Sequence, residues 1–257
     1  MRNIRIRLAY DGTGYAGWQV QPGQPTIQAA IELALSQIEG HPVNVHGSGR
    51  TDAGVHALGQ VASFGLENPI PPENLKKALN RLLPRDIRVL ECGEVRASFH
   101  ARHSAVAKNY EYRICRAEVC PPFLRCFVYH HPYPLDEAAM IAGAAAFEGE
   151  YDFRSFASAG GNEMESTVRK IYSSWLRRQE ELLVYRVRGS GFLYHMVRNI
   201  VGTLLEVGRG NLAADDIAGI IRVKDRGAAG PMAPAQGLFL VSVEYGSEAA
   251  GEPPGQA

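Results

Sequence analysis

Cysteines and long apolar runs are both scarce in this chain of 257 residues. Its four cysteines have no Cys-x-x-Cys spacing, and no histidine pair follows them at zinc-ligand spacing; they are Cys92, Cys115, Cys120 and Cys126. We therefore expect reduced thiols rather than a structural zinc site. No run of about 18 apolar residues is present, and the N-terminus alternates arginine with isoleucine instead of forming a signal core. These absences predict a cytoplasmic protein that does not enter a membrane.

An excess of charge of one sign is also absent. Lysine plus arginine and aspartate plus glutamate number 27 each, and no long run of one sign occurs. This excludes a polyanion-binding tail but leaves room for a local basic patch that binds nucleic acid. The composition, 46% hydrophobic and 21% charged, is that of an ordinary globular chain rather than a disordered, collagen-like or coiled-coil one.

The hydrophobic periodicity predicts the order β-α-β-β-α-β twice, as two split β-α-β units in tandem. The expected elements of the first half are strands at 4–10, 43–46, 61–64 and 87–90 and helices at 27–38 and 75–82. Those of the second half are strands at 108–114, 168–177, 182–188 and 237–245 and helices at 135–147, 193–204 and 214–222. Thr26 and Gly40 are the expected caps of the first helix. A polar loop is expected at 157–166.

The densest chemical signal lies in residues 46–57. Three glycines fall within eight residues around Arg50 and Asp52, so backbone N–H groups and side chains can approach a ligand closely. The alternative is a surface turn with an exposed ion pair. The segment lacks the Gly-Lys-Ser/Thr of a phosphate-binding loop and the glycine spacing of a dinucleotide site, and Asp52 has no acidic neighbour in sequence for glycosidase chemistry.

Residues 49–56, Gly-Arg-Thr-Asp-Ala-Gly-Val-His, resemble the signature of the bacterial tRNA pseudouridine synthase A family. Three further segments agree with that family in order and spacing. They are Tyr-Asp-Gly-Thr-Gly-Tyr-Ala-Gly-Trp-Gln at 10–19, Phe-His-Ala-Arg at 99–102 followed by Lys-Asn-Tyr-Glu-Tyr at 108–112, and Phe-Leu-Tyr-His-Met-Val-Arg-Asn-Ile-Val-Gly at 192–202. The resemblance spans about residues 2–245. Ser48 stands where relatives often have alanine, a change that we expect to be neutral.

The resemblance implies an isomerase that converts uridine to pseudouridine at positions 38, 39 and 40 of the tRNA anticodon stem-loop. It implies a homodimer without a metal or an organic cofactor. The implied fold is α+β, with two tandem ferredoxin-like or RRM-like halves that form one mixed sheet with a central active-site cleft. The expected domains are 1–104 with the catalytic aspartate loop and 105–246 with Tyr110 and the Arg198 segment, followed by a disordered tail at 247–257.

The reaction breaks the N1–C1′ bond, rotates the uracil and joins C5 to C1′ in a site that excludes water. By resemblance, the group that opens the bond is Asp52. Its carboxylate can attack C1′, add to C6 or remove the C2′ proton, and the sequence does not choose among these routes. Burial of the carboxyl group favours its neutral form, whereas a nearby guanidinium favours its ionised form. The resemblance gives the role of that guanidinium to Arg198. The alternative for Arg198 is a position on a helix surface.

The target uridine must leave its stack, which costs a few kcal/mol. Arg50 is the candidate for filling the space that the base vacates. Tyr110 is the candidate for stacking on the flipped base, an interaction worth about 1–3 kcal/mol, and for accepting the C5 proton. A strand-core aromatic is the alternative for Tyr110. Tyr112, on the same strand face, is expected in the core and outside the site.

The remaining candidates are expected to support binding. Three histidines, His56, His100 and His195, are expected to form hydrogen bonds or face phosphate, and Trp18 is expected to pack in the interior. Dispersed arginines are expected to hold the RNA backbone; they are Arg2, Arg5, Arg7, Arg102 and Arg154. Three other functions compete: a synthase for another RNA uridine, a non-catalytic RNA-binding module, and a hydrolase or metal enzyme. A binding module needs no acid beside phosphate, and no second acid or ligand cluster accompanies Asp52.

Overall fold

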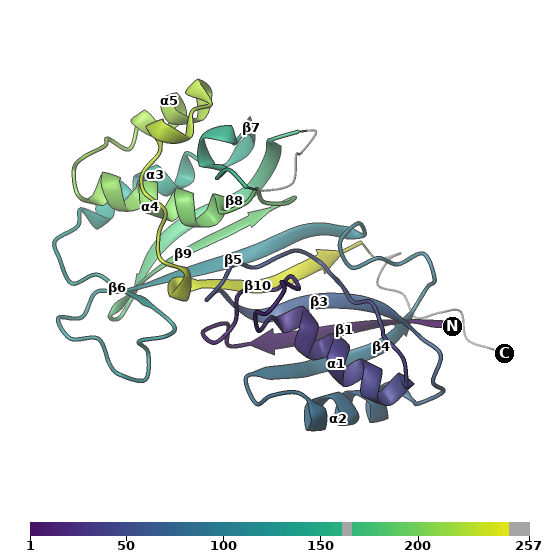
Figure 1. The fold of residues 1–257 in the computed structure, drawn as a ribbon. Coiled ribbons are helices and arrows are strands. Elements are labelled where there is room, and N and C mark those ends of the chain that lie inside the picture. The colour runs from purple at the N-terminus through teal and green to yellow at the C-terminus, as the bar shows by residue number, and fades with distance from the viewer. Residues whose placement is uncertain (161–165, 247–257) are drawn as a thin grey trace. The chain divides into compact units, whose positions relative to one another are not determined.

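The structure is a computed structural model that describes residues 1–160 and 166–246. The chain forms two compact units (Figure 1). Unit 1 is Met1–Val106 together with the chain from Leu240 onward, and unit 2 is Ala107–Phe239. The expected tail at 247–257 and half of the loop expected at 157–166 lie outside the described residues.

Unit 1 is a split β-α-β unit. Its elements are β1 (Arg2–Tyr10), α1 (Ile27–Glu39), β2 (His46–Gly47), β3 (His56–Leu66), α2 (Pro72–Leu82), β4 (Ile87–Val95) and most of β10 (Leu238–Tyr245). The sheet order is β4-β1-β3-β10, with β2 also on β3. The pairs β1–β3, β1–β4 and β2–β3 are antiparallel. The alternation expected for β1 is confirmed, because Ile4, Ile6 and Leu8 are fully buried.

Helix α1 begins and ends where its sequence predicts. The Thr26 side chain accepts a hydrogen bond from the Ala29 N–H, and Gly40 takes the left-handed conformation with φ of 80°. Both contacts are local, so their residue types alone are sufficient to place them.

The strand expected at 43–46 is confirmed only at its last residue, because β2 comprises His46–Gly47. Val43 and Val45 are buried, but only His46–Gly47 pairs with β3. The backbone of Val45 is instead satisfied by helix α1: its N–H donates to Glu32 Oε1 (3.1 Å), and its carbonyl accepts from Gln28 Nε2 (3.2 Å). Side chains of a helix thus replace the neighbouring strand.

Unit 2 has the same plan with additions. Its elements are β5 (Ala105–Cys115), β6 (Tyr129–His130), α3 (Glu137–Ala145), β7 (Gly149–Asp152), β8 (Val168–Gln179), β9 (Leu182–Gly189), α4 (Met196–Gly208) and α5 (Asp216–Val223). The first two residues of β5 belong to unit 1, because unit 2 begins at Ala107. The order is β5-β9-β8-β7 with antiparallel neighbours, and β6 runs parallel to β5. Strands β6 and β7 were not expected. The α+β class and the repeated β-α-β-β-α-β order are confirmed.

Helix α4 begins at Met196 rather than at Leu193 as the apolar stripe suggests. His195 precedes it with φ of 62°, in the left-handed region. A residue in that conformation cannot continue a right-handed helix, so the apolar residue Leu193 packs from the preceding turn.

Within the described residues, no helix is long and apolar enough to cross a membrane. All four cysteines are free, as expected. In the same part of the chain, no group of three or more histidine, cysteine, aspartate or glutamate side chains could hold a metal ion.

His131 of unit 2 is a buried pH-sensitive group. Its ring nitrogens lie between two guanidinium groups, with Nδ1 at 3.1 Å from Arg116 and Nε2 at 3.2 Å from Arg209. Burial, followed by the charges of Arg209 and Arg116, lowers the pKa of His131 below its ordinary value of 6.5. The folded protein therefore resists protonation at this ring.

Acidification from pH 7 to pH 5 should accordingly destabilise the fold through His131. The unfolded state binds a proton at this residue near pH 6.5, whereas the folded state binds it only at lower pH. We expect the free energy of unfolding, measured in urea at pH 7, 6 and 5, to fall less steeply in His131→Gln than in the wild type. His41→Gln, at a half-exposed ring, is the control. Equal slopes for wild type and His131→Gln would contradict this assignment.

Candidate active site

The aspartate loop, residues 48–56, is held against residues 10–19 by backbone hydrogen bonds. The Trp18 N–H donates to the Thr51 carbonyl (3.0 Å), and the Gly54 N–H donates to the Tyr15 carbonyl (3.3 Å). Two segments that lie far apart in the sequence thus meet along their backbones. This contact joins two of the segments on which the family resemblance rests.

The close approach of these two segments requires glycine at two positions. A Cβ on Gly12 would lie 2.1 Å from the Val55 carbonyl oxygen, and one on Gly17 would lie 2.5 Å from the Thr51 carbonyl oxygen. Gly17 also has φ of 99°. Any side chain at either position would push the aspartate loop away.

Asp52 is half-buried at the start of a turn in this loop. Its carbonyl accepts from the Val55 N–H (3.1 Å), and Gly54 in the turn has φ of 76°. Arg50 is exposed, and its Nε donates to Gln19 Oε1 (3.0 Å). The loop therefore presents a carboxylate from a fixed backbone and a guanidinium from an exposed arm.

Buried polar side chains form hydrogen bonds that support the aspartate loop. The hydroxyls of Tyr10 and Thr51 are 2.8 Å apart and both residues are buried. Burial raises the pKa of Tyr10, so its hydroxyl stays neutral. Gln60, fully buried, accepts from the Ser48 hydroxyl (2.6 Å) and donates to the Gly49 carbonyl (3.0 Å). Ser48 is thus a buried, hydrogen-bonded residue.

His56 closes the loop. Its Nδ1 accepts from the Gly12 N–H (3.0 Å), so the neutral ring carries its proton on Nε2. Asp11 Oδ1 lies 3.2 Å from the same nitrogen, and a protonated ring would pair with Asp11 instead. Both interactions hold residues 10–19 to the loop, in keeping with a hydrogen-bonding role.

Trp18 is packed, as expected for a structural aromatic. It is buried and its ring lies 6.2 Å from that of Tyr10, centroid to centroid. A Cβ on Gly47 would lie about 2.5 Å from the Trp18 indole. The indole therefore fixes the strand that leads into the aspartate loop.

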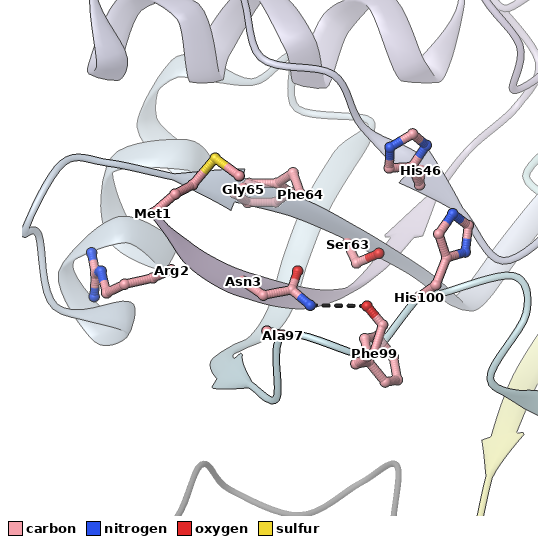
Figure 2. Close-up of a pocket in the computed structure, with 10 residues that line it drawn as sticks. All are labelled: Met1, Arg2, Asn3, His46, Ser63, Phe64, Gly65, Ala97, Phe99 and His100. Atoms are coloured by element: carbon pink, nitrogen blue, oxygen red, sulfur yellow. Dashed lines mark hydrogen bonds between the residues drawn. The ribbon is translucent and has the colours of Figure 1, made fainter. Parts of the chain in front are cut away.

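The Phe-His-Ala-Arg segment at 99–102 borders a pocket of about 190 Å³ in unit 1 (Figure 2). Asn3 Nδ2 donates to the Phe99 carbonyl (2.9 Å), and the Ala101 N–H donates to Ser63 Oγ (3.1 Å). The His100 ring lies 5.0 Å from that of His46. Burial and nearby positive groups lower the pKa of His100, so this ring is neutral at pH 7.

Tyr110 and Arg198 belong to unit 2, whereas Asp52 and Arg50 belong to unit 1. Tyr110 is 8% exposed on β5, opposite Val187 of β9. The Phe192 ring packs on it edge to face, with centroids 5.0 Å apart. Tyr110 is therefore a buried strand residue whose ring orientation is fixed by an adjacent aromatic edge.

Tyr112 is fully buried, so the expectation that it belongs to the core is confirmed. Its hydroxyl donates to the Pro234 carbonyl (2.7 Å). Burial raises the pKa of Tyr112, and the charge of Arg198 opposes that shift. Tyr112 therefore lies within electrostatic reach of Arg198 and supports the same segment that Arg198 contacts.

Arg198 is buried, 8% exposed, rather than spread on a helix surface. Its Nε donates to the Ala233 carbonyl (2.8 Å), and its own carbonyl accepts from the Ala233 N–H (3.1 Å). Bonds in both directions hold the first turn of α4 to residues 230–234. A buried guanidinium must satisfy its donors, and this contact satisfies Nε.

The sequence reasoning missed two supports of the Arg198 helix. Asn199, fully buried, donates to the Phe156 carbonyl (2.7 Å) and accepts from Arg226 (2.9 Å). Residues 230–234 form the other support. The signal that could have found this segment is its run of proline and small residues between two helical or strand patterns, Gly-Pro-Met-Ala-Pro. His195 stacks on Tyr194, with ring centroids 3.6 Å apart.

Two of the arginines expected to hold RNA form ion pairs within unit 1. Arg7 contacts Glu91 (2.6 Å), and Arg2 contacts Glu94 (3.4 Å). Arg2 also donates to the Asn68 and Ile70 carbonyls, so its guanidinium is held within unit 1, whereas the more exposed pair of Arg7 is of a weak kind. The roles of these arginines, of Arg5, and of Arg102 and Arg154 stay predictions.

Sequence comparison assigns this architecture to a class of RNA-modifying enzymes. The sequence model of the tRNA pseudouridine synthase family matches residues 7–104 and 144–246. The chain is 61% identical to tRNA pseudouridine synthase A of Solibacter usitatus over 95% of this chain and 100% of the relative. It is 47% identical to tRNA pseudouridine synthase A of Caldicellulosiruptor saccharolyticus, again over 95% and 100%.

The chain belongs to the tRNA pseudouridine synthase family. It is therefore an isomerase, of the synthase A type that both relatives represent. Among solved structures, a chain from a Cbf5-Nop10-Gar1 complex matches with a TM-score of 0.34 and 14% identity, over 78% of this chain and 54% of that chain. A likeness of this size does not bear on the site.

Proposed function

We propose that this isomerase converts uridine to pseudouridine at positions 38, 39 and 40 in the anticodon stem-loop of tRNA. The observation that carries the proposal is the aspartate loop, whose half-buried carboxylate stands on a backbone fixed by residues 10–19. We further propose a cytoplasmic homodimer that uses no metal and no organic cofactor. These choices agree with the resemblance of the four motifs.

Asp52 is the proposed group that opens the glycosidic bond. Its turn is held by Trp18, Gly54 and buried Thr51, so the carboxylate needs little rearrangement before reaction. Attack on C1′, addition to C6 and removal of the C2′ proton each begin with an ionised carboxylate. In all three, the N1–C1′ bond breaks, the uracil rotates and C5 bonds to C1′. The carboxylate leaves the carbon that it attacked, or returns the C2′ proton, and the C5 proton is lost last.

Arg50 and Tyr110 are the proposed partners of the flipped nucleotide. Arg50 is exposed, and its hydrogen bond to Gln19 uses Nε rather than the end of the guanidinium, which suits an arm that enters the space left by the base. Tyr110 offers a ring held by Phe192, which suits stacking on the uracil. Its hydroxyl is the proposed acceptor of the C5 proton.

Arg198 is the proposed counter-ion of Asp52 during the reaction. A guanidinium pairs with a carboxylate more strongly than a neutral donor does. The bond from Nε to the Ala233 carbonyl holds the guanidinium in a fixed position at the start of α4. This assignment rests on the motif resemblance and on the burial of Arg198.

The decisive experiment maps pseudouridine by carbodiimide-stop primer extension. Purified protein is incubated with unmodified tRNA that carries uridines at 38, 39 and 40, without added metal or cofactor and with a parallel reaction in chelator. We expect new stops at those three positions. Stops at other uridines only would assign a different target, and tight binding without any stop would favour a non-catalytic RNA-binding module.

Tyr110→Phe should retain affinity for tRNA but turn over more slowly. The ring can still stack and contact Phe192, while the hydroxyl that accepts the C5 proton is lost. General-base removal of this kind costs about 10²-fold or more in kcat. Single-turnover kinetics with tritium at C5 would measure the release step. A release rate equal to that of the wild type would remove the hydroxyl from the mechanism.

A further inference from the structure

The chain between α5 and β10 runs alongside α4, and residues 226–233 contact that helix (Figure 1). The Gly230 N–H donates to the hydroxyl of buried Thr203 (2.9 Å). Three residues further on, the Ala233 carbonyl accepts from Arg198 Nε (2.8 Å), and the Ala233 N–H donates to the Arg198 carbonyl (3.1 Å). The position of residues 226–233 along α4 therefore determines where the carbonyl that holds the Arg198 guanidinium lies.

Arg226 joins the beginning of this segment to α4 through two hydrogen bonds of its guanidinium. Its Nη2 donates to Asn199 Oδ1 (2.9 Å), and its Nη1 donates to the Ala229 carbonyl (3.2 Å). Asn199 is fully buried and donates from Nδ2 to the Phe156 carbonyl (2.7 Å), so the acceptor that Arg226 reaches on α4 is fixed. Arg226 therefore bridges a fixed side chain of the helix and the backbone of the segment that leads to Ala233.

The shape of the Arg226 guanidinium, rather than its charge, makes this bridge. Both acceptors are neutral oxygen atoms, one of a side-chain amide and one of a peptide group, so the bridge is not an ion pair. Donors in a planar fork reach two acceptors at a fixed separation. A lysine would keep the charge but replace the fork by a single ammonium on a flexible stem. Arginine and lysine are therefore not equivalent in this bridge, although either would serve for a phosphate contact.

We propose that Arg226 is a positioning residue for the isomerisation, which acts through Arg198 and does not contact the RNA. Its two hydrogen bonds hold residues 229–233 at one position along α4, and Ala233 in turn holds Arg198 Nε. The inference rests on the proposed function, which gives Arg198 the role of counter-ion to Asp52. A displacement of about 1 Å at a group that acts in the reaction can cost about 10²-fold in rate.

The test compares Arg226→Lys and Arg226→Gln with a charge-matched control. The control is Arg222→Gln, which removes one positive charge from an exposed position of α5. Steady-state assays on unmodified tRNA give kcat and KM, and fluorescence anisotropy gives the Kd for the same tRNA over a range of salt. Arg226→Lys keeps the charge and serves alone if Arg226→Gln does not fold.

We expect both Arg226 variants to lower kcat by about 10–10²-fold, because the Arg198 guanidinium loses its fixed position. KM and Kd should stay within about twofold of those of Arg222→Gln, and the slope of log Kd against log salt should not change, because no phosphate contact is lost. Such a split between kcat and KM separates a residue that positions a reacting group from one that binds the substrate.

A double-mutant cycle with Arg198→Lys shows whether the effect passes through Arg198. If Arg226 acts by positioning that guanidinium, Arg226→Gln should cost no more than about a further twofold in the Arg198→Lys background. A general weakening of unit 2 would instead lower the rate by the same factor in both backgrounds. Single-turnover assays with the protein in excess over tRNA keep the slow variants measurable.

Turnover by Arg226→Lys equal to that of Arg222→Gln would overturn the proposal, and so would an equal loss in both backgrounds of the cycle. A raised KM with a shallower salt dependence and unchanged kcat would also overturn it, and would make Arg226 a phosphate contact.

The proposed function fails separately from this inference. The cycle is measured on whichever uridine the wild type modifies, so absence of pseudouridine at 38–40 would reject the target and leave the cycle intact. Wild-type turnover by Arg198→Lys would reject the counter-ion. A slow Arg198→Lys together with a normal Arg226→Gln would reject the positioning role alone.

Discussion

Asp52→Asn should abolish formation of pseudouridine while leaving tRNA binding nearly intact. The amide is close in shape to the carboxylate and keeps the turn in which the Asp52 carbonyl accepts from Val55. It cannot act as a nucleophile or base. Removal of a group that makes the first bond typically costs about 10⁴-fold or more in kcat, so we expect a loss of that size in single-turnover assays, with Asp52→Ala alike.

Affinity separates loss of chemistry from loss of structure in this experiment. Phosphate contacts dominate the affinity for RNA, so the Kd of Asp52→Asn for tRNA should stay within about twofold of the wild type. Asp215→Asn, at an exposed position before α5, is the matched control and should turn over normally. Repeated turnover by Asp52→Asn at a tenth of the wild-type rate would reject the role given to this carboxylate.

Gly202→Ala should destabilise unit 2 by about 3 kcal/mol or more. Gly202 lies inside α4, and a Cβ there would stand 1.6 Å from the Pro231 carbonyl oxygen and 2.8 Å from its carbon. Both atoms are backbone, so the helix or residues 230–234 must move. Overpacking of side chains alone costs about 1–3 kcal/mol, and a backbone clash is harder to relieve.

The same substitution should lower kcat at saturating tRNA in whatever protein remains folded. Residues 230–234 hold Arg198 through Ala233, so their displacement loosens the guanidinium. Gly219→Ala is the control: it lies in α5, where a Cβ would meet no atom of the described residues within 4 Å, and alanine should stabilise the helix by about 0.5–1 kcal/mol. A urea-unfolding free energy for Gly202→Ala within about 1 kcal/mol of the wild type would contradict the close contact.

Local sequence was sufficient for the elements whose contacts are local. The alternation of β1 and the caps of α1 at Thr26 and Gly40 need only neighbouring residues. Most of the strand expected at 43–46 does not form, because the Val45 backbone is bound by the side chains of Glu32 and Gln28, which the pattern cannot place. The predicted start of α4, at Leu193, was wrong because His195 takes the left-handed conformation, and histidine is not a residue type that signals a helix break.

The sequence by itself determined the family, the order of the elements and the candidate residues, because motifs and periodicity are properties of the linear chain. Only the tertiary structure decided what holds those residues. The contact of Gly12 and Gly17 with the aspartate loop and the bonds from Arg198 to Ala233 join residues more than thirty positions apart. Such neighbours are chosen by the packing of whole elements, and packing depends on the entire chain rather than on any one segment.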